Sequence, residues 1–115
     1  MKINTFEEIK SWQKALDLNT KIYSSFNVCK DYSFRDQIQR ASVSIMNNIA
    51  EGFERQTNNE LIRFLYIAKG SCGETRSMVI LAKQLGYISE DDEKMYLDLT
   101  DEISKLIYGF IKSVS

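Results

Sequence analysis

The side chains best suited to chemistry lie in two segments near the middle of the chain. Residues 40–52 (RASVSIMNNIAEG) and 68–74 (AKGSCGE) place polar and charged groups within an apolar pattern. Paired carboxylates such as Glu51 and Glu74 can perform acid–base chemistry or bind a metal ion. The chain has no histidine, so it lacks an imidazole base, a Ser-His or Cys-His pair and the Glu-x-x-His motif of di-iron bundles. We therefore expect no catalytic residue, no metal site and no cofactor.

The same polar residues can hold two helices together. If residues 34–53 and 58–85 form a helical hairpin that turns near Gln56, residues whose numbers sum to about 113 lie opposite each other. Arg40 then lies near Glu74, where the two can form a partly buried, charge-assisted pair. We predict a structural polar network whose members are Arg40, Ser44, Asn48, Glu51, Ser71 and Glu74. A ligand or nucleic-acid pocket at these residues is the first alternative, and catalysis by the two glutamates is the second.

Composition and charge fit one soluble domain spanning residues 1–115. Hydrophobic residues make up 43% of the chain and charged residues 27%, and the formal net charge is -1. This balance lacks the basic excess typical of dedicated nucleic-acid binders. No signal peptide and no apolar run of about 18 residues is recognised, so no membrane partner is expected. Cys29 and Cys72 match no metal or redox spacing, which predicts two reduced thiols in a cytoplasmic protein.

Apolar spacing and capping residues predict four helices, over residues 6–26, 34–53, 58–85 and 90–111 or beyond. The short loops between them indicate an all-α, antiparallel up-and-down four-helix bundle. Capping-box spacing at Thr5 and Glu8 favours the early start of the first helix, and a start near Ser11 after a separate turn is the alternative. The predicted core positions are Ile9, Trp12, Leu16, Ile22 or Tyr23, Phe26, Phe34, Ile38, Ala41, Ile45, Ile49, Leu61, Phe64 or Leu65, Ala68, Cys72, Thr75, Val79, Ala82, Leu85, Met95, Leu99, Ile103, Leu106, Phe110 and Val114.

Polar residues and glycines mark the expected helix ends. Ser33, Thr57 and Ser89 are the predicted N-caps of the second, third and fourth helices, and Gly86 follows the end of the third. Gly70 and Gly73 fall inside the third helix, where each costs about 1 kcal/mol relative to alanine. We interpret these two glycines as places where another helix approaches closely.

The third helix carries more apolar surface than a one-sided core requires. Residues 61–68 are interrupted only by Arg63, and residues 78–82 contain no polar side chain. At 100° per residue, these runs cover most of the helix circumference. We predict a homo-oligomer interface at Ile62, Tyr66 and Ile80. Scattered apolar residues on an ordinary surface are the alternative.

Four segments resemble a known family. Residues 40–52 and 64–74 (FLYIAKGSCGE), with 11–15 (SWQKA) and 85–88 (LGYI), resemble the signatures of four-helix bundle proteins encoded within 23S rRNA intervening sequences. The resemblance implies a cytoplasmic bacterial protein that forms a ring-shaped homopentamer without enzymatic activity. The accessory variability determinant of diversity-generating retroelements is similar in fold and binds nucleic acid and a reverse transcriptase through a basic surface. This chain departs from it in the dense acidic residues of segment 90–102.

The leading functional prediction is a non-catalytic oligomeric binding protein, with itself and an RNA or ribosome-associated molecule as partners. The cations that could contact phosphate are Arg35, Arg40, Arg55, Arg63, Lys69 and Arg76, although we favour salt-bridged or solvated roles for them. One alternative is a scaffold that binds only protein, through the ends of the bundle or through a tyrosine-rich surface made of Tyr23, Tyr32, Tyr66, Tyr87, Tyr96 and Tyr108. The other is an enzyme that uses Glu51 and Glu74.

Overall fold

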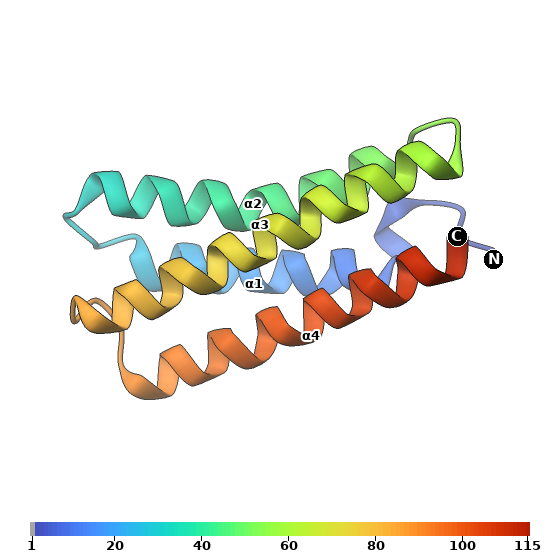
Figure 1. Cartoon of the computed structure of the whole chain (residues 1–115). Helices are drawn as coiled ribbons and strands as arrows, with labels where there is room; N and C mark the ends of the chain where they lie inside the picture. Colours follow the sequence, from blue (N-terminus) through green and yellow to red (C-terminus); the bar gives the residue numbers. More distant parts are fainter. Residues whose placement is uncertain (1) are drawn as a thin grey trace.

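Four long helices form an elongated antiparallel bundle (Figure 1) with principal extents of 43 × 22 × 19 Å. The computed structural model describes residues 2–115, with a short 3-10 turn η1 (Phe6–Glu8) followed by α1 (Lys10–Phe26), α2 (Tyr32–Phe53), α3 (Asn58–Gln84) and α4 (Glu90–Val114). Helix α1 packs against α2 and α4, and α3 packs against the same two helices. The predicted all-α four-helix bundle is confirmed. Across residues 2–115 no helix combines the length and the apolar character needed to cross a lipid bilayer.

The first helix begins later than the favoured prediction. Residues 6–8 form a separate turn, and the Thr5 N–H donates to the Glu8 carboxylate over 3.1 Å. Ile9 is extended, with φ -76° and ψ 122°, and its side chain is buried in the core. A continuous helix over residues 6–26 is therefore wrong, and the alternative of a separate turn is correct. The extended residue interrupts the helix because it carries the Ile9 side chain inward.

Helix α2 is capped by Asp31, so the predicted Ser33 cap is wrong. The Asp31 carboxylate accepts from the Phe34 N–H over 3.2 Å, and its second oxygen accepts from the Tyr87 hydroxyl over 2.7 Å. These two hydrogen bonds, the Tyr87 bond first, lower the pKa of Asp31 below its usual value. The tyrosine thereby fixes the cap two residues earlier than local sequence indicates, and α2 begins at Tyr32.

The other predicted helix ends are confirmed. The Thr57 and Ser89 hydroxyls accept from backbone N–H groups three residues later, at 3.2 and 3.1 Å. Gly86 has φ 79°, a conformation that glycine adopts without strain. The Tyr87 N–H donates to the Ala82 carbonyl over 2.8 Å, and the Gly86 N–H bonds the Lys83 carbonyl over 3.1 Å. This paired pattern closes the C-terminal end of α3.

The core contains residues of all four helices, but prediction of the buried faces succeeded unevenly. The expected positions of α2 are all buried, and those of α3 are buried except at its C-terminal end, where Leu85 is exposed. In α1, Leu16 is exposed and Leu18 is buried in its place. The predicted α4 stripe is offset, because Met95, Leu99, Leu106, Phe110 and Val114 are only half-buried. The residues buried on α4 are Tyr96, Thr100, Ile103, Ile107 and Ile111.

A neighbouring helix approaches closely at Gly52, and not at Gly70 and Gly73, where we predicted close approach. A Cβ atom on Gly52 would lie 2.7 Å from the Cβ of Phe64, closer than packed side chains allow. Within residues 2–115, and apart from the adjacent residues and backbone of α3 itself, no atom lies within 4 Å of the corresponding positions on Gly70 and Gly73, which are both exposed. The prediction that another helix approaches Gly70 and Gly73 is therefore wrong within a single chain.

The two cysteines are free thiols with different surroundings. Cys72 is buried, and its Sγ donates to the Thr100 carbonyl over 3.0 Å, whereas Cys29 is half-buried. Burial raises the pKa of the Cys72 thiol to about 11. The thiol is therefore protonated at neutral pH and acts as a small packing group between α3 and α4.

Candidate functional site

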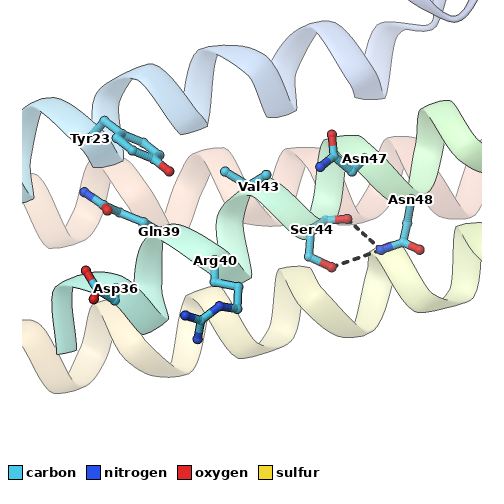
Figure 2. Close-up of a pocket in the computed structure, with 8 residues that line it drawn as sticks. All are labelled: Tyr23, Asp36, Gln39, Arg40, Val43, Ser44, Asn47 and Asn48. Atoms are coloured by element: carbon cyan, nitrogen blue, oxygen red, sulfur yellow. Dashed lines mark hydrogen bonds between the residues drawn. The ribbon is translucent and has the colours of Figure 1, made fainter. Parts of the chain in front are cut away.

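A small polar contact joins α2 to α3 at the middle of the predicted network. The Ser44 and Ser71 hydroxyl oxygens lie 2.9 Å apart, and the Asn48 side-chain amide donates to the Ser44 carbonyl and hydroxyl over 2.8 and 2.9 Å (Figure 2). The hairpin register thus falls within a few residues of the predicted one. Three of the six predicted network residues are brought together here, and the contact fixes how α2 and α3 align.

Arg40 and Glu74 lie near this contact but do not pair with each other. Both are exposed, and both line an open hollow of about 520 Å³ between α2 and α3. None of the ion pairs within residues 2–115 joins them. The predicted charge-assisted pair is therefore absent from the single chain. Water solvates both groups at this position, and an exposed ion pair contributes little free energy.

The two glutamates considered for catalysis are far apart along the hairpin. Glu51 pairs with Arg55 at 3.1 Å, one turn along the chain, and both side chains are exposed. Ten residues of helix, roughly 15 Å, separate the level of Glu51 from the level opposite Glu74. No group of three or more acidic or cysteine side chains within residues 2–115 is arranged to hold a metal ion. Glu51 and Glu74 are therefore not assembled into a carboxylate pair.

A second open hollow, of about 540 Å³, follows the other side of α2. Figure 2 shows Tyr23 of α1 and Gln39 of α2 facing each other, whereas Arg40 points to the opposite side of α2, toward α3. The lining is mostly polar and consists of Tyr23, Asp36, Gln39, Arg40, Val43, Ser44, Asn47 and Asn48. The outer surface of α2 therefore offers hydrogen-bonding groups to a ligand or to water.

The surface of α3 that points away from the core has the opposite character. Tyr66, Ile67, Ile80 and Leu81 are exposed by 53%, 42%, 45% and 46%, and Ile62 at one end is half-buried. We call these five residues the α3 outer face. Ile62, Tyr66 and Ile80 are the predicted interface residues, whereas Ile67 and Leu81 were not predicted, although both lie in the apolar runs that indicated the face. They form a strip with an apolar group toward each end of α3 and exposed small and polar residues between the two groups.

Gly70 and Gly73 lie between the two apolar ends of this strip. Each is exposed, and the space beside each is open. Because neither glycine has a side chain, the strip is lower at its centre than at Tyr66 and Ile80. A second helix could approach the backbone of α3 there.

Three of the cations proposed for phosphate contact are engaged within the chain. Arg35 pairs with Asp36 at 3.1 Å, and Arg55 pairs with Glu51 at the same distance. The Arg76 guanidinium donates to the Leu97 carbonyl over 2.7 Å and to the Thr100 hydroxyl over 3.1 Å, which ties α3 to α4.

The remaining cations of that prediction do not gather into one basic stripe. Arg63 is exposed, with its guanidinium carbon 5.8 Å from the centre of the Phe64 ring. Lys69 is half-buried and lines a separate hollow of about 420 Å³ between α3 and α4, together with Lys105 and Tyr108. Arg40 faces the opposite side of α3 from Lys69. The cations thus point in several directions.

Five of the six tyrosines are exposed, but Tyr96 is not part of that surface. Its ring is fully buried, and its hydroxyl donates to the Lys21 carbonyl over 2.7 Å and hydrogen-bonds to Ser25. Burial raises the pKa of Tyr96. Tyr96 therefore joins α4 to α1 inside the bundle, and its inclusion in a binding surface is wrong.

A buried polar contact that sequence analysis did not predict joins α1 to α2. The Asn19 amide donates to the Ala15 carbonyl over 2.9 Å and to the Ser42 carbonyl over 3.1 Å, and the Ser42 hydroxyl donates back to Asn19 over 2.9 Å. The only signal for it was the interruption of an apolar stripe at Asn19. With every partner satisfied, the contact is structural.

Comparison with known proteins gives two matches of high coverage. A family model for the 23S rRNA-intervening sequence protein matches residues 7–109. A solved structure from Bacteroides thetaiotaomicron VPI-5482, described as a protein with unknown function from the S23 ribosomal protein family, has 28% sequence identity and a TM-score of 0.82. That alignment covers 89% of this chain and 98% of the other. No curated protein matches the sequence.

Proposed function

Because the chain belongs to the family of 23S rRNA-intervening sequence proteins, we propose that it is a non-catalytic binding protein that assembles with copies of itself. The observation that carries this proposal is the α3 outer face. Tyr66 and Ile80, its most prominent members, are about half exposed on the side of the helix opposite the core. Large apolar side chains exposed together on one side of a folded domain favour an interaction site.

The composition of the face favours another copy of the chain as its partner. Covering the exposed half of each large apolar side chain contributes roughly 1 kcal/mol, so four such residues supply about 4 kcal/mol toward the association free energy. The open backbone at Gly70 and Gly73 allows a helix of the second copy to pack closely. The approximately 1 kcal/mol that each glycine costs the helix is offset if it improves packing between subunits.

A ring of five copies in the cytoplasm is the form of assembly that the family resemblance supports. Closed rings use heterologous contacts, in which one patch of each subunit meets a different patch of the next. The α3 outer face then supplies one of the two patches. Static light scattering at micromolar concentration tests the assembly, with five times the 13.3 kDa of one chain as the expected mass. A mass of one chain overturns self-assembly, and another multiple corrects only the subunit number.

RNA or a ribosome-associated molecule is the ligand class suggested by family membership. Among the six cations named for phosphate contact, Arg63 and Lys69 make no ion pair within residues 2–115, and a ring would repeat each of them around its axis. An electrophoretic shift assay against structured RNA across a salt series tests this part of the proposal. Binding should be strongest at low salt because neutralised phosphates release counterions. No shift at low salt removes RNA from the proposal and leaves self-assembly unaffected.

The alternative function is a scaffold that binds only protein. It is favoured by the intrachain contacts of Arg35, Arg55 and Arg76, which reduce the charge available to phosphate. A protein partner that is retained through nuclease treatment supports this alternative, whereas a partner lost on nuclease treatment supports the RNA assignment. For both the RNA-binding and the protein-only function, the separation of Glu51 from Glu74 supports a role in binding without catalysis.

A further inference from the structure

One edge of α3 places a charged residue between two exposed apolar ones. Ile67, Glu74 and Leu81 follow one another at seven-residue intervals, so they lie along the same side of the helix, toward α2. Ile67 and Leu81 belong to the α3 outer face, and Glu74 is exposed between them. A chain that covers Ile67 and Leu81 also removes water from Glu74. A carboxylate buried without a partner is strongly unfavourable, so assembly requires a cation at this place.

Arg40 of α2 is the cation placed to meet this requirement. It lines the same hollow as Glu74 and has no ion-pair partner within residues 2–115. The other acid of the hollow, Asp36, already pairs with Arg35 at 3.1 Å. Beneath the two free side chains, the contact between the Ser44 and Ser71 hydroxyls keeps α2 and α3 in fixed alignment.

The charge of this hollow also indicates what can cover it. Its ionisable residues are Asp36, Arg40 and Glu74, two acids and one base, so it does not attract a phosphate backbone. With Asp36 held by Arg35, the exposed pair of Arg40 and Glu74 is neutral overall. A neutral, largely apolar protein surface complements such a pair, and a second copy of this chain provides one.

Resting on the self-assembly proposed above, we propose that Arg40 and Glu74 form an ion pair when a second copy covers the α3 outer face, and that this pair makes the contact selective. In the free chain both groups are solvated and contribute little to stability. In the assembly, loss of either partner leaves the other charge buried and unpaired, which weakens association far more than the pair strengthens folding. A surface that fails to enclose both groups gains nothing from them.

Neutralising each partner separately tests the inference. For Glu74→Gln and Arg40→Gln, we expect the dissociation constant of the assembly to rise about thirtyfold or more, measured by mass photometry on dilution and by subunit-exchange rates. The double variant Arg40→Glu/Glu74→Arg should recover most of the lost affinity because it restores opposite charges. Thermal unfolding of the dissociated chain, followed by circular dichroism, should not change, since both residues are exposed there.

The matched control is Asp98→Asn on α4, which breaks an exposed pair with Lys94 at 3.0 Å and should leave assembly unchanged. If the wild-type chain assembles and both single variants assemble as tightly, the ion-pair inference is wrong while self-assembly stands. Failure of the charge-swapped double variant to recover affinity also overturns the pairing. A wild-type chain that stays monomeric at micromolar concentration overturns self-assembly and the ion pair together.

Discussion

The outer surfaces of α2 and α3 belong to one hairpin but differ sharply in character. Along α2 the exposed side chains are mainly amides, hydroxyls and charges, such as Gln37, Arg40 and Asn47. Along α3 the exposed side chains include Tyr66 and Ile80. The two helices pack against each other, and yet their outward-facing side chains differ. One side of the hairpin is mainly polar, and the other exposes large apolar side chains.

The largest expected effect comes from placing a charge on the apolar side. Ile80→Lys should abolish assembly at micromolar concentration, because covering the α3 outer face would then bury an unpaired ammonium. Light scattering should report the mass of a single chain, and circular dichroism should show unchanged helical content. Asn47→Lys, on the polar outer surface of α2, is the control and should assemble normally. Equal assembly of both variants would remove the functional distinction between the two surfaces.

The next largest effect separates the glycine that contacts its neighbouring helix from those that do not. Gly52→Ala should destabilise the folded chain by about 2 kcal/mol, because the new methyl group collides with Phe64. Urea denaturation of the dissociated chain measures this change. A neutral or stabilising result would mean that α2 and α3 can separate at this level without loss of packing.

Gly73→Ala should act in the opposite direction on the isolated chain. No other helix of the described chain lies within 4 Å of the added methyl group, so alanine should stabilise α3 by up to about 1 kcal/mol. The same substitution should weaken assembly if a second helix packs against this backbone, and a dilution series measures that loss. Stabilisation without weaker assembly would place the subunit contact elsewhere on α3.

The smallest expected effect concerns the acid response of the α2 cap. The pKa of Asp31 is lowered in the folded chain, so its carboxylate favours folding above its unfolded pKa, and this contribution is lost as pH falls through the folded pKa. Asp31→Asn keeps a capping oxygen but cannot titrate. Its melting temperature should therefore fall less steeply than that of the wild type below about pH 4. If the melting temperatures of the variant and the wild type fall in parallel with pH, the cap contributes nothing to acid sensitivity.

Sequence patterns were most informative where one face of a helix is plainly apolar. Ile38, Ile45 and Ile49 repeat with few competitors, so the buried face of α2 was predictable. On α4 apolar residues extend around more of the helix. The face that is buried is the one that contains Tyr96, whose hydroxyl hydrogen-bonds to α1, and not the predicted one. Periodicity alone does not contain that tertiary contact.

The candidate site was predicted in outline but not in its pairings. The hairpin register placed Ser44 close to Ser71, because both helices and the turn between them were recognisable. Whether Arg40 reaches Glu74 depends on side-chain solvation, which residue spacing does not determine. The positions of the glycines were equally ambiguous. Gly52 faces Phe64 of α3 and Gly73 faces open space, and sequence spacing does not indicate this difference. Facing direction requires the assembled bundle.

The hydrogen bond between Asp31 and Tyr87 has a consequence for the order of folding. It joins the α1–α2 loop to the α3–α4 loop, residues separated by 56 positions in the chain. The hairpin of α1 and α2 supplies only Asp31, and the hairpin of α3 and α4 supplies only Tyr87, so neither can form the bond alone. Contacts between distant segments carry the greatest loop-closure cost, so this bond should form when the two hairpins dock, after each has folded. The Tyr87 phenol is thus placed to report the last stage of refolding.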